Sequence, residues 1–556
     1  MERSSSTIYR QLGIAAEDRR IDLLWMLLWT IAALLLYTWQ LGDLPLRDWD
    51  EGIVATVARE IWRSRFDQSV WLFPQYIDGA PYINKPPLMH WLVSIAYLMG
   101  GVNESMARLP GALLSAISVP LLYWVGREMF YRRLPAIFAA GVYLTYLPVV
   151  RQGRLAMLDG AILCFLILMW GCLLRSRRDF RWSLGIGASI GLMCLTKGLL
   201  GIVLGAIGLA FLLWDTPRIF RSGYFWLGLL LGMMPVIGWY SAQYEHYGLP
   251  FIQAHFLEQS LNRVGQAVER NAGSVWFYLL EILKYGSIWL VFIPLGIRLL
   301  WRDWHLSWAK MLSLWFGSYF LIISVMQTKL PWYAMPLYPA IALLVGASLT
   351  DLWEPAQQNL MAGIRIPAHR LWAGTFFTLS GLVLSALIYY LLQGSEPDLV
   401  LICGTLAMTL MVAGITALQQ SRQFILVLIW GSYLTLLGFV SSEHWVWELA
   451  ERPAVKPIAA LVKRHTPAKQ PVYTTAPESR PSLEFYSDRR IIPTNWQWLE
   501  ATKTPQTTLT VLVPQSDLAI AKTITSKSFK PIAQIEGWAI VEAKPTPAAS
   551  PNQPQS

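Results

Sequence analysis

The chain has 556 residues, of which 54% are hydrophobic and only 14% are charged, and its mean hydropathy is +0.40. This composition predicts a membrane protein rather than a soluble domain. The apolar runs are many and continuous rather than alternating, which excludes a single-span anchor and a β-barrel. The net charge of +10 fits membrane topology and anionic lipid phosphates, and no nucleic-acid partner is expected.

Thirteen apolar runs are predicted to cross the membrane, because each is long enough for roughly 30 Å of hydrocarbon. The N-terminal residues 1–20 carry Arg10, Arg19 and Arg20, which places them in the cytoplasm. Alternate connections after them are also basic, as the positive-inside rule requires. The predicted spans are residues 21–42, 108–127, 134–150, 157–174, 181–197, 198–214, 222–240, 280–300, 308–326, 332–350, 371–392, 398–418 and 423–441.

The remaining segments are assigned by the same topology. The apolar stretch Leu88–Gly100 has only 13 residues and is expected to be juxtamembrane or re-entrant. Two long loops, 43–107 and 241–279, face outward from the membrane domain at 21–441. Residues 442–543 contain short β-rich runs at Val472–Thr475, Thr508–Val513 and Trp538–Val541, which predict a small α/β domain on the periplasmic side. The Pro-, Ala- and Gln-rich residues 544–556 are expected to be a disordered tail.

The first outer loop contains a pair of carboxylates, Asp50 and Glu51, in front of an amphipathic helical pattern. Taken alone, an aspartate that opens a helix is more often a helix cap. A carboxylate at the membrane boundary is also suited to act as a general base for a membrane-bound substrate, and here there are two. Catalysis and helix capping therefore both remain open as functions of this pair.

Several cations occupy span ends on the outer face, where lysine and arginine are disfavoured. Each can be explained separately as a snorkelling side chain or as a charge that complements a helix end. Together they suit a ligand with a lipid tail and a phosphate head. They are Lys85, Arg151, Arg154, Lys197 and Lys329, with Asp159 at the start of the span that follows Arg154.

The second outer loop contains His255 and Glu258, which would share one face of an α-helix. This spacing is compatible with a metal ligand at His255, although a surface histidine is the commoner explanation. Phosphate-loop, dinucleotide and paired-cysteine motifs do not occur in the sequence. These motifs therefore predict no particular cofactor, and a divalent metal is left open.

Five short motifs together resemble one family. They are Asp50-Glu51, Asn84-Lys85-Pro86-Pro87-Leu88, Arg154-Leu155-Ala156-Met157-Leu158-Asp159, Leu195-Thr196-Lys197-Gly198 and Thr328-Lys329-Leu330-Pro331-Trp332-Tyr333. In order and spacing over about residues 20–345 the chain resembles the bacterial GT-C glycosyltransferases. These are relatives of the protein O-mannosyltransferases and of the lipid A aminoarabinose transferase.

The resemblance implies a multi-pass helical GT-C fold, a polyprenyl-phosphate sugar donor, reaction on the outer face and inversion at the anomeric carbon. It implies that Asp50, beside Glu51, is the catalytic acid/base position. It also implies that Lys85, Lys197, Lys329 and Tyr333 form the donor-phosphate region. Further candidates are Arg154 and Arg263 for the phosphate, and Asp159, Tyr82 and Asn84 elsewhere in the site.

Two positions depart from the aminoarabinose transferases. Ile53 stands where they carry an arginine, which argues against lipid A-type donor recognition. Asn84 stands where they carry an acidic residue, which argues against a metal site built from that residue and His255.

The sequence thus predicts a glycosyltransferase of the bacterial inner membrane that uses a polyprenyl-phosphate sugar and a lipid or protein acceptor. Glycosyl transfer needs a base for the acceptor proton and cations for the departing phosphate, which matches the residues above. A lipid-linked sugar flippase is the alternative, although the inverted repeats and interrupted spans typical of transporters are not evident. A non-catalytic envelope scaffold would leave Asp50 and the lysines unexplained.

Overall fold

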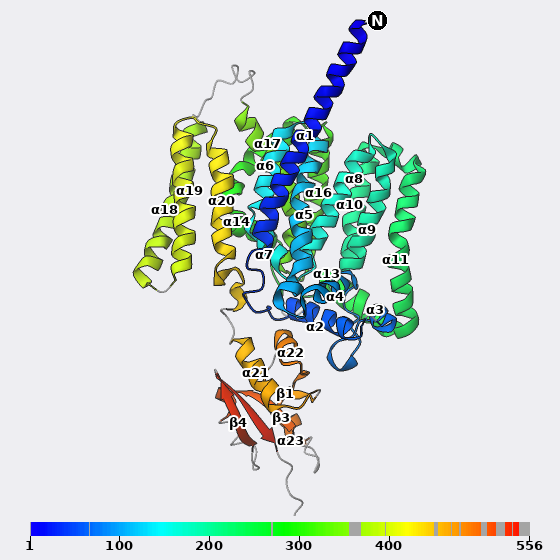
Figure 1. Cartoon of the computed structure of the whole chain (residues 1–556), viewed down its shortest axis with the longest axis vertical. Helices are drawn as coiled ribbons and strands as arrows, with labels where there is room; N and C mark the ends of the chain where they lie inside the picture. The colour runs from blue at the N-terminus through cyan, green and yellow to red at the C-terminus, as the bar shows by residue number, and fades with distance from the viewer. Residues whose placement is uncertain are drawn as a thin grey trace, which may run out of the picture. The chain divides into compact units, whose positions relative to one another are not determined.

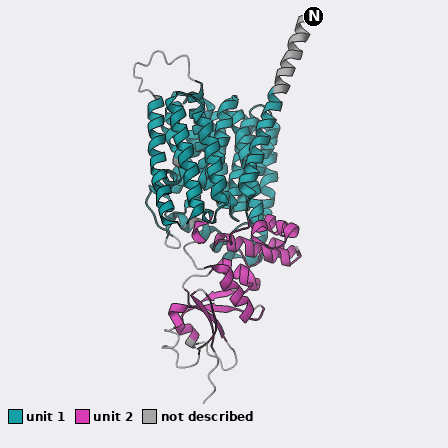
Figure 2. Ribbon diagram, turned by 60° about the vertical axis from the view of Figure 1, so that its left-hand side comes forward, with its two compact units in different colours: residues 1–41, 83–89, 108–445 teal, residues 42–82, 90–107, 446–556 magenta. Residues whose placement is uncertain are grey.

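The computed structural model describes residues 2–65, 67–267, 271–354, 368–394, 396–449, 454–468, 470–476, 480–501, 509–518, 529–535 and 537–543. By their contacts the residues form two compact units, which Figure 2 colours separately. Unit 1 comprises residues 1–41, 83–89 and 108–445, and unit 2 comprises residues 42–82, 90–107 and 446–556. Most of the first outer loop therefore belongs to the same unit as the C-terminal segment. The tail predicted at 544–556 lies outside the described residues.

Unit 1 is a bundle of helices, most of which run side by side in Figure 1. Their sequences are continuous apolar runs, and proline stands in the first turn of α7, α15, α17 and α19, where its missing N–H costs nothing. The long helices are α1 (Glu2–Thr38), α5 (Glu104–Phe130), α6 (Arg133–Leu144), α8 (Asp159–Ser176), α9 (Ser183–Lys197), α10 (Leu199–Asp215), α11 (Gly223–Tyr247), α16 (Ser307–Val325), α17 (Tyr338–Trp353), α18 (Ala368–Gln393), α19 (Pro397–Leu418) and α20 (Phe424–Val440).

Shorter elements connect these helices. They are α7 (Leu147–Arg154), η2 (Phe180–Trp182), η3 (Pro217–Arg221), α12 (Leu249–Ile252), η4 (Gln253–Leu261), α13 (Asn262–Gly265), α14 (Phe277–Gly286), η6 (Ser287–Phe292), α15 (Ile293–Arg302), η7 (Pro331–Leu337) and η9 (Glu443–Trp445). In Figure 1, α7 and α13 lie at the end of the bundle opposite the N-terminus of α1.

Each of the thirteen predicted spans coincides with a helix or a pair of helices. Among the described residues eight helices are long and apolar enough to cross a membrane, or ten if two bent pairs count as one span each. Helices α9, α10 and α20 have 15, 17 and 17 residues. At 1.5 Å per residue they are shorter than roughly 30 Å of hydrocarbon, so the number thirteen stays a prediction.

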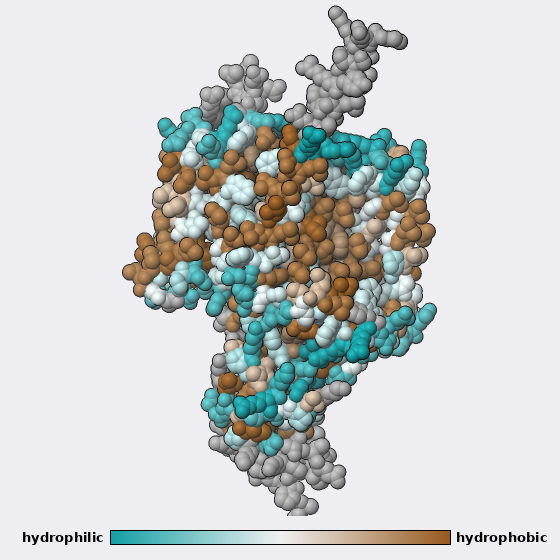
Figure 3. Space-filling view, in the orientation of Figure 1, coloured by the Kyte–Doolittle hydropathy of each residue, from teal (hydrophilic) through white to brown (hydrophobic). Residues whose placement is uncertain are grey.

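The surface of unit 1 is that of a lipid-exposed bundle. Large apolar side chains stand on its outside, and Leu230, Leu382 and Met408 are 64%, 65% and 69% exposed. Figure 3 shows apolar residues covering the helices, with hydrophilic residues along the upper edge. This distribution confirms the predicted multi-pass α-helical membrane protein.

Unit 2 contains a five-stranded sheet in the order β2-β1-β3-β5-β4. Strands β2, β1 and β3 are parallel, while β5 pairs antiparallel with β3 and with β4. Three of the strands were predicted, and β2 and β4 were missed. In β4 the Pro531 ring removes a backbone donor, which explains both the edge position and the register shift beside it. The strands are β1 (Val472–Thr474), β2 (Ile491–Pro493), β3 (Leu509–Pro514), β4 (Phe529–Ile535) and β5 (Trp538–Ala543).

Helices cover both faces of this sheet. On one face α21 (Val455–His465) and α22 (Pro481–Ser487) pack on Val472, Leu512 and Ile540. On the other face Leu499 of α23 (Trp496–Ala501) packs on Val511 and Val541. Alternate residues of β3 and β5 therefore enter opposite core clusters, as the two-residue period of a strand requires. The predicted small α/β fold is confirmed.

The first outer loop contributes its own helices to unit 2. Helix α2 begins at Asp50, and residues on two sides of it are buried, including Glu51, Val57 and Arg59. The sequence predicted an amphipathic helix with one apolar face. Burial of Arg59 and Glu51 shows that α2 also packs against other parts of unit 2 on its polar side. The elements are α2 (Asp50–Arg63), α3 (Gln68–Leu72), η1 (Ile77–Gly79), α4 (Leu88–Gly100, of which 90–100 lie in unit 2), η10 (Trp447–Leu449) and η11 (Gln515–Asp517).

Candidate functional site

A buried ion pair joins two of the predicted site residues in unit 1. Lys197 is the last residue of α9, and its Nζ donates to Oδ1 of Asp159, the first residue of α8, at 2.7 Å. The two side chains are 12% and 4% exposed. Each charge also complements the dipole of its own helix end. Because both charges are nearly buried, each depends on the other for compensation.

Gly198 ends α9 directly after this lysine. Its φ of +57° lies in the left-handed region, and its N–H donates to the Cys194 carbonyl oxygen at 2.9 Å. A Cβ atom here would come within 2.9 Å of the Tyr240 hydroxyl and 3.1 Å of Nε2 of His255. Glycine is therefore required both by the backbone conformation and by the close approach of two side chains.

We expect Gly198→Ala to destabilise the protein by about 1–2 kcal/mol, because a positive φ is unfavourable for alanine and its Cβ atom would displace the Tyr240 side chain. Thermal unfolding in detergent, followed by tryptophan fluorescence, measures this change. Gly238→Ala is the matched control, since its Cβ would meet no atom within 4 Å beyond its chain neighbours and the adjacent backbone of its own helix. An equal melting temperature for wild type and Gly198→Ala would contradict the explanation.

Backbone hydrogen bonds tie the second outer loop to the segment that holds Lys329. Thr328 N donates to the Arg263 carbonyl oxygen at 3.1 Å, and Lys329 N donates to that of Asn271 at 2.8 Å. The Thr328 hydroxyl adds a bond of 2.8 Å to the Gln266 carbonyl oxygen. These bonds position Arg263 beside η7, the 3-10 helix that carries Tyr333.

Three cations are connected through neutral acceptors. Arg263 donates to the Tyr333 hydroxyl and to Oε1 of Gln259, each at 3.1 Å. Lys85 donates to the same Gln259 oxygen at 3.2 Å, and Nζ of Lys197 lies 5.8 Å from the centre of the Tyr333 ring. Lys85, Lys197 and Arg263, with Asp159, Gln259 and Tyr333, are called the cation cluster here. It combines three positive charges with one carboxylate, and this excess suits an anion.

His255 lies beside the cluster. Its Nε2 is 2.7 Å from the Tyr240 hydroxyl and its Nδ1 is 3.2 Å from the Ile83 carbonyl oxygen. Burial, with a smaller contribution from the charge of Lys85, lowers the pKa of His255 to about 4, so the ring is neutral. Among the described residues no three His, Cys, Asp or Glu side chains are placed to hold a metal ion.

The segment around His255 is not a regular α-helix. Residues Gln253–Leu261 form a π-helix, in which Asn262 N donates to the Leu257 carbonyl oxygen. The wider turn changes which residues share a face, so the expected pairing of His255 with Glu258 does not follow. It also brings Gln259, which the sequence gave no reason to select, between Lys85 and Arg263.

Two further residues predicted to bind phosphate, Lys329 and Arg154, donate to carbonyl oxygens at helix ends. Lys329 is 4% exposed and donates to the carbonyl oxygens of Ile323 and Ser324, at 3.1 and 2.7 Å, near the C-terminus of α16. Burial lowers its pKa. Arg154 is fully buried, donates to the Leu36 and Trp39 carbonyl oxygens at the end of α1, and lies 4.5 Å from the Trp445 ring. The dipole explanation therefore accounts for the described contacts of both residues.

The predicted catalytic carboxylates lie in unit 2 and differ in environment. Asp50 has a side chain 38% exposed, 3.3 Å from Nη2 of Arg47. Glu51 is fully buried and accepts the Arg47 backbone N–H at 2.8 Å. The helix-cap explanation does not hold, because Trp49 occupies the N-cap position and makes no side-chain cap bond. Asp50 is thus the more accessible of the two.

The other two predicted site residues, Tyr82 and Asn84, belong to different units. Tyr82 is buried against Val57 and Ile61 in unit 2, and this burial, with the nearby charge of Asp50, raises its pKa. Asn84 is exposed in unit 1. Arg47, three residues before Asp50, was not given a function by the sequence. Tyr240 could not have been found, because it lies within a predicted apolar span.

Comparison with known proteins supports the same family. Residues 84–241 match the family of dolichyl-phosphate-mannose-protein mannosyltransferases. A protein of Aquifex aeolicus is 28% identical over 60% of this chain and 66% of its own length. The undecaprenyl phosphate-alpha-4-amino-4-deoxy-L-arabinose arabinosyl transferase 1 of Pseudomonas fluorescens is 24% identical over 58% of each chain. The chain thus covers less than two thirds of either relative.

The fold has a close counterpart among solved structures. The crystal structure of ArnT from Cupriavidus metallidurans bound to undecaprenyl phosphate superimposes with a TM-score of 0.75 at 19% identity, over 96% of this chain and 99% of that one. At this identity the likeness concerns the fold. It nevertheless extends through the residues after 345, where the sequence motifs end. The resemblance to the GT-C glycosyltransferases is therefore confirmed, and the chain is a multi-pass membrane protein with the fold of that family.

Proposed function

We propose that the chain transfers a sugar from a polyprenyl-phosphate carrier to an acceptor hydroxyl at the periplasmic face of the bacterial inner membrane. The observation that carries the proposal is the cation cluster. In it Lys197 and Arg263 both approach Tyr333, Lys85 shares the Gln259 acceptor with Arg263, and Asp159 pairs with Lys197. An enzyme that releases a lipid phosphate needs this excess of positive charge. The name of the Pseudomonas fluorescens relative, which specifies an undecaprenyl phosphate sugar, supports the donor class.

The reaction is a single displacement with inversion. The acceptor oxygen forms a bond to the anomeric carbon while the bond from that carbon to the phosphate oxygen breaks. Asp50 takes the proton of the acceptor hydroxyl, and the lipid phosphate leaves with the bonding electrons. Lys197 and Arg263 stabilise the charge that develops on it, and Lys85 binds the same group. His255 stays neutral and orients Tyr240 and the backbone at Ile83.

The direct test uses the full chain in lipid nanodiscs with a panel of radiolabelled undecaprenyl-phosphate hexoses and pentoses. Envelope lipids and proteins from a deletion strain serve as acceptors, and mass spectrometry identifies the product. We expect one donor to give a new glycosylated product. A flippase would instead move labelled donor across a vesicle bilayer without forming a product, and that outcome would replace the proposal.

A separate prediction concerns the side of the membrane on which each connection lies. It rests on the observation that every second connection between the predicted spans is basic. In a Cys403→Ala background, where the other three cysteines are buried, single cysteines at Asn84 and Arg464 should react with a membrane-impermeant reagent added to the periplasmic side. A cysteine at Asp179 should react only after the membrane is opened. Labelling at position 179 in intact cells would overturn the orientation proposed here.

A further inference from the structure

Helix α2, which carries Asp50, is packed against the C-terminal segment, residues 446–543 of unit 2. A Cβ atom at Gly52 would lie 2.5 Å from the backbone nitrogen of Ser482 in α22, so only glycine allows this approach. Two turns further on, Nη1 of the buried Arg59 donates to the Phe485 carbonyl oxygen at 2.7 Å. The backbone of α2 is therefore in direct contact with α22.

The candidate base is linked to the C-terminal segment through one arginine. Arg47 is buried and donates from Nη1 to Oε1 of Glu448, at 3.0 Å, and from Nη2 to Oδ2 of Asp50, at 3.3 Å. The guanidinium is planar, so its two ends cannot move independently. Glu448 thereby restricts where the Asp50 carboxylate can lie.

A second link holds the turn immediately before α2. Asp48 accepts hydrogen bonds from Nε of Arg480, at 2.9 Å, and from the hydroxyl of Ser482. The Asp48 and Arg480 side chains are only 6% and 11% exposed. Between Asp48 and Asp50, Trp49 has a φ of +65°, which is strained for a bulky residue. Such a conformation persists only where surrounding contacts impose it, and these two links are such contacts.

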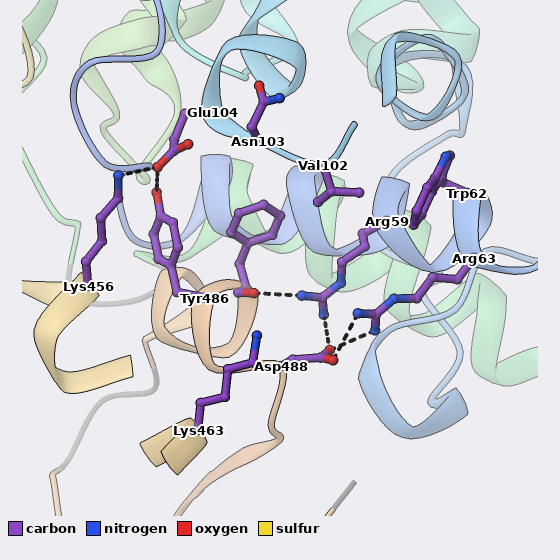
Figure 4. Close-up of a pocket in the computed structure, with 11 residues that line it drawn as sticks. Arg59, Trp62, Arg63, Val102, Asn103, Glu104, Lys456, Lys463, Tyr486 and Asp488 are labelled. Carbon is purple, nitrogen blue, oxygen red and sulfur yellow. Dashed lines mark hydrogen bonds and ion pairs between the residues drawn. The ribbon is translucent and has the colours of Figure 1, made fainter. Parts of the chain in front are cut away.

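The far end of α2 is held differently. A cavity of about 470 Å³ lies there, lined by residues of α2 and of the C-terminal segment, including Lys456 and Lys463. Figure 4 shows Arg59 and Arg63 both reaching Asp488 across this region. The Arg63 side chain is 41% exposed and its bonds to Asp488 are 2.7 and 2.9 Å. This ion pair is remote from Asp50 by about 20 Å along the helix and provides a matched control.

We propose that the C-terminal segment is the positioning element for Asp50, acting through Glu448 on Arg47 and through Arg480 and Ser482 on Asp48. The inference rests on the proposed function, because it assigns to this segment the geometry of the candidate base. Asp48, Glu448 and Arg480 are positioning residues and do not themselves contact substrate. An error of about 1 Å in the base costs up to roughly 100-fold in rate, so their loss should be visible in turnover.

The test uses Asp48→Asn and Glu448→Gln in the full chain, with the donor that the wild type uses. We expect kcat to fall about 10- to 100-fold, while the donor KM and the Kd for undecaprenyl phosphate stay within about twofold. Arg63→Gln should leave all three unchanged, and Arg480→Lys should retain more activity than Arg480→Gln. In an Asp50→Asn background, Asp48→Asn should cause no further loss, because the group that it positions is already absent.

Two results would overturn the inference. One is a wild-type kcat in folded Asp48→Asn and Glu448→Gln proteins, and the other is an equal loss from Asp48→Asn with and without Asp50. If the wild type transfers no sugar, the proposed function fails, but hydrogen exchange still tests the positioning. Arg480→Gln should then speed amide exchange at residues 50–55 relative to Arg63→Gln, and unchanged exchange would reject the positioning element.

Discussion

Asp50→Asn is expected to reduce sugar transfer by about 10²- to 10⁴-fold, because an amide cannot accept the proton of the acceptor hydroxyl. The fold should survive the change. Asp50 makes no helix-cap bond, and its contact with Arg47 spans only three residues and leaves the carboxylate 38% exposed. A partly exposed pair of this kind contributes at most about 1 kcal/mol.

The measurement is transfer from the polyprenyl-phosphate sugar, together with the melting temperature of the same preparation. Asp67→Asn is the matched control, since Asp67 lies in the same loop and caps α3 through the Ser69 N–H. Asparagine caps helices as well as aspartate does, so this variant should behave as wild type. Near-wild-type transfer by Asp50→Asn would eliminate Asp50 as the base.

Lys197→Gln is expected to weaken binding of undecaprenyl phosphate by roughly 10- to 150-fold, since a hydrogen bond to a charged group contributes about 1.5–3 kcal/mol. Glutamine keeps a donor for Asp159 while removing the charge that a phosphate requires. Binding of undecaprenyl phosphate to the purified protein measures the effect without knowledge of the sugar or the acceptor.

The control for Lys197 is another buried ion pair in unit 1. Arg177 lies 3.3 Å from Asp215, with side chains 14% and 8% exposed, against 12% and 4% for Lys197 and Asp159. Arg177→Gln should therefore lower the melting temperature to a similar extent and leave lipid phosphate binding intact. If Lys197→Gln and Arg177→Gln bind undecaprenyl phosphate with equal affinity, Lys197 has only a structural function.

The lysines show what a sequence motif cannot resolve. Lys197 and Lys329 look alike locally, because each stands within two residues of a helix-breaking residue at the end of an apolar run. Their partners differ because the chain brings different groups to each. Lys197 meets a carboxylate 38 residues away, whereas Lys329 meets the free carbonyl oxygens at the end of α16. The side-chain partner of a charge depends on tertiary packing, which residue type and spacing do not encode.

The sequence alone determined the multi-pass helical fold and most members of the cation cluster, because hydropathy over some twenty residues and short motifs are local properties of the chain. Tertiary structure decided two further matters. The π-helix places Gln259 between Lys85 and Arg263. The residue types of that segment do not indicate a π-helical hydrogen-bond pattern. Tertiary structure also placed α2 beside α22, joining Asp48 to a partner 432 residues away. Such a contact depends on how two surfaces fit, and a linear pattern carries no information about that fit.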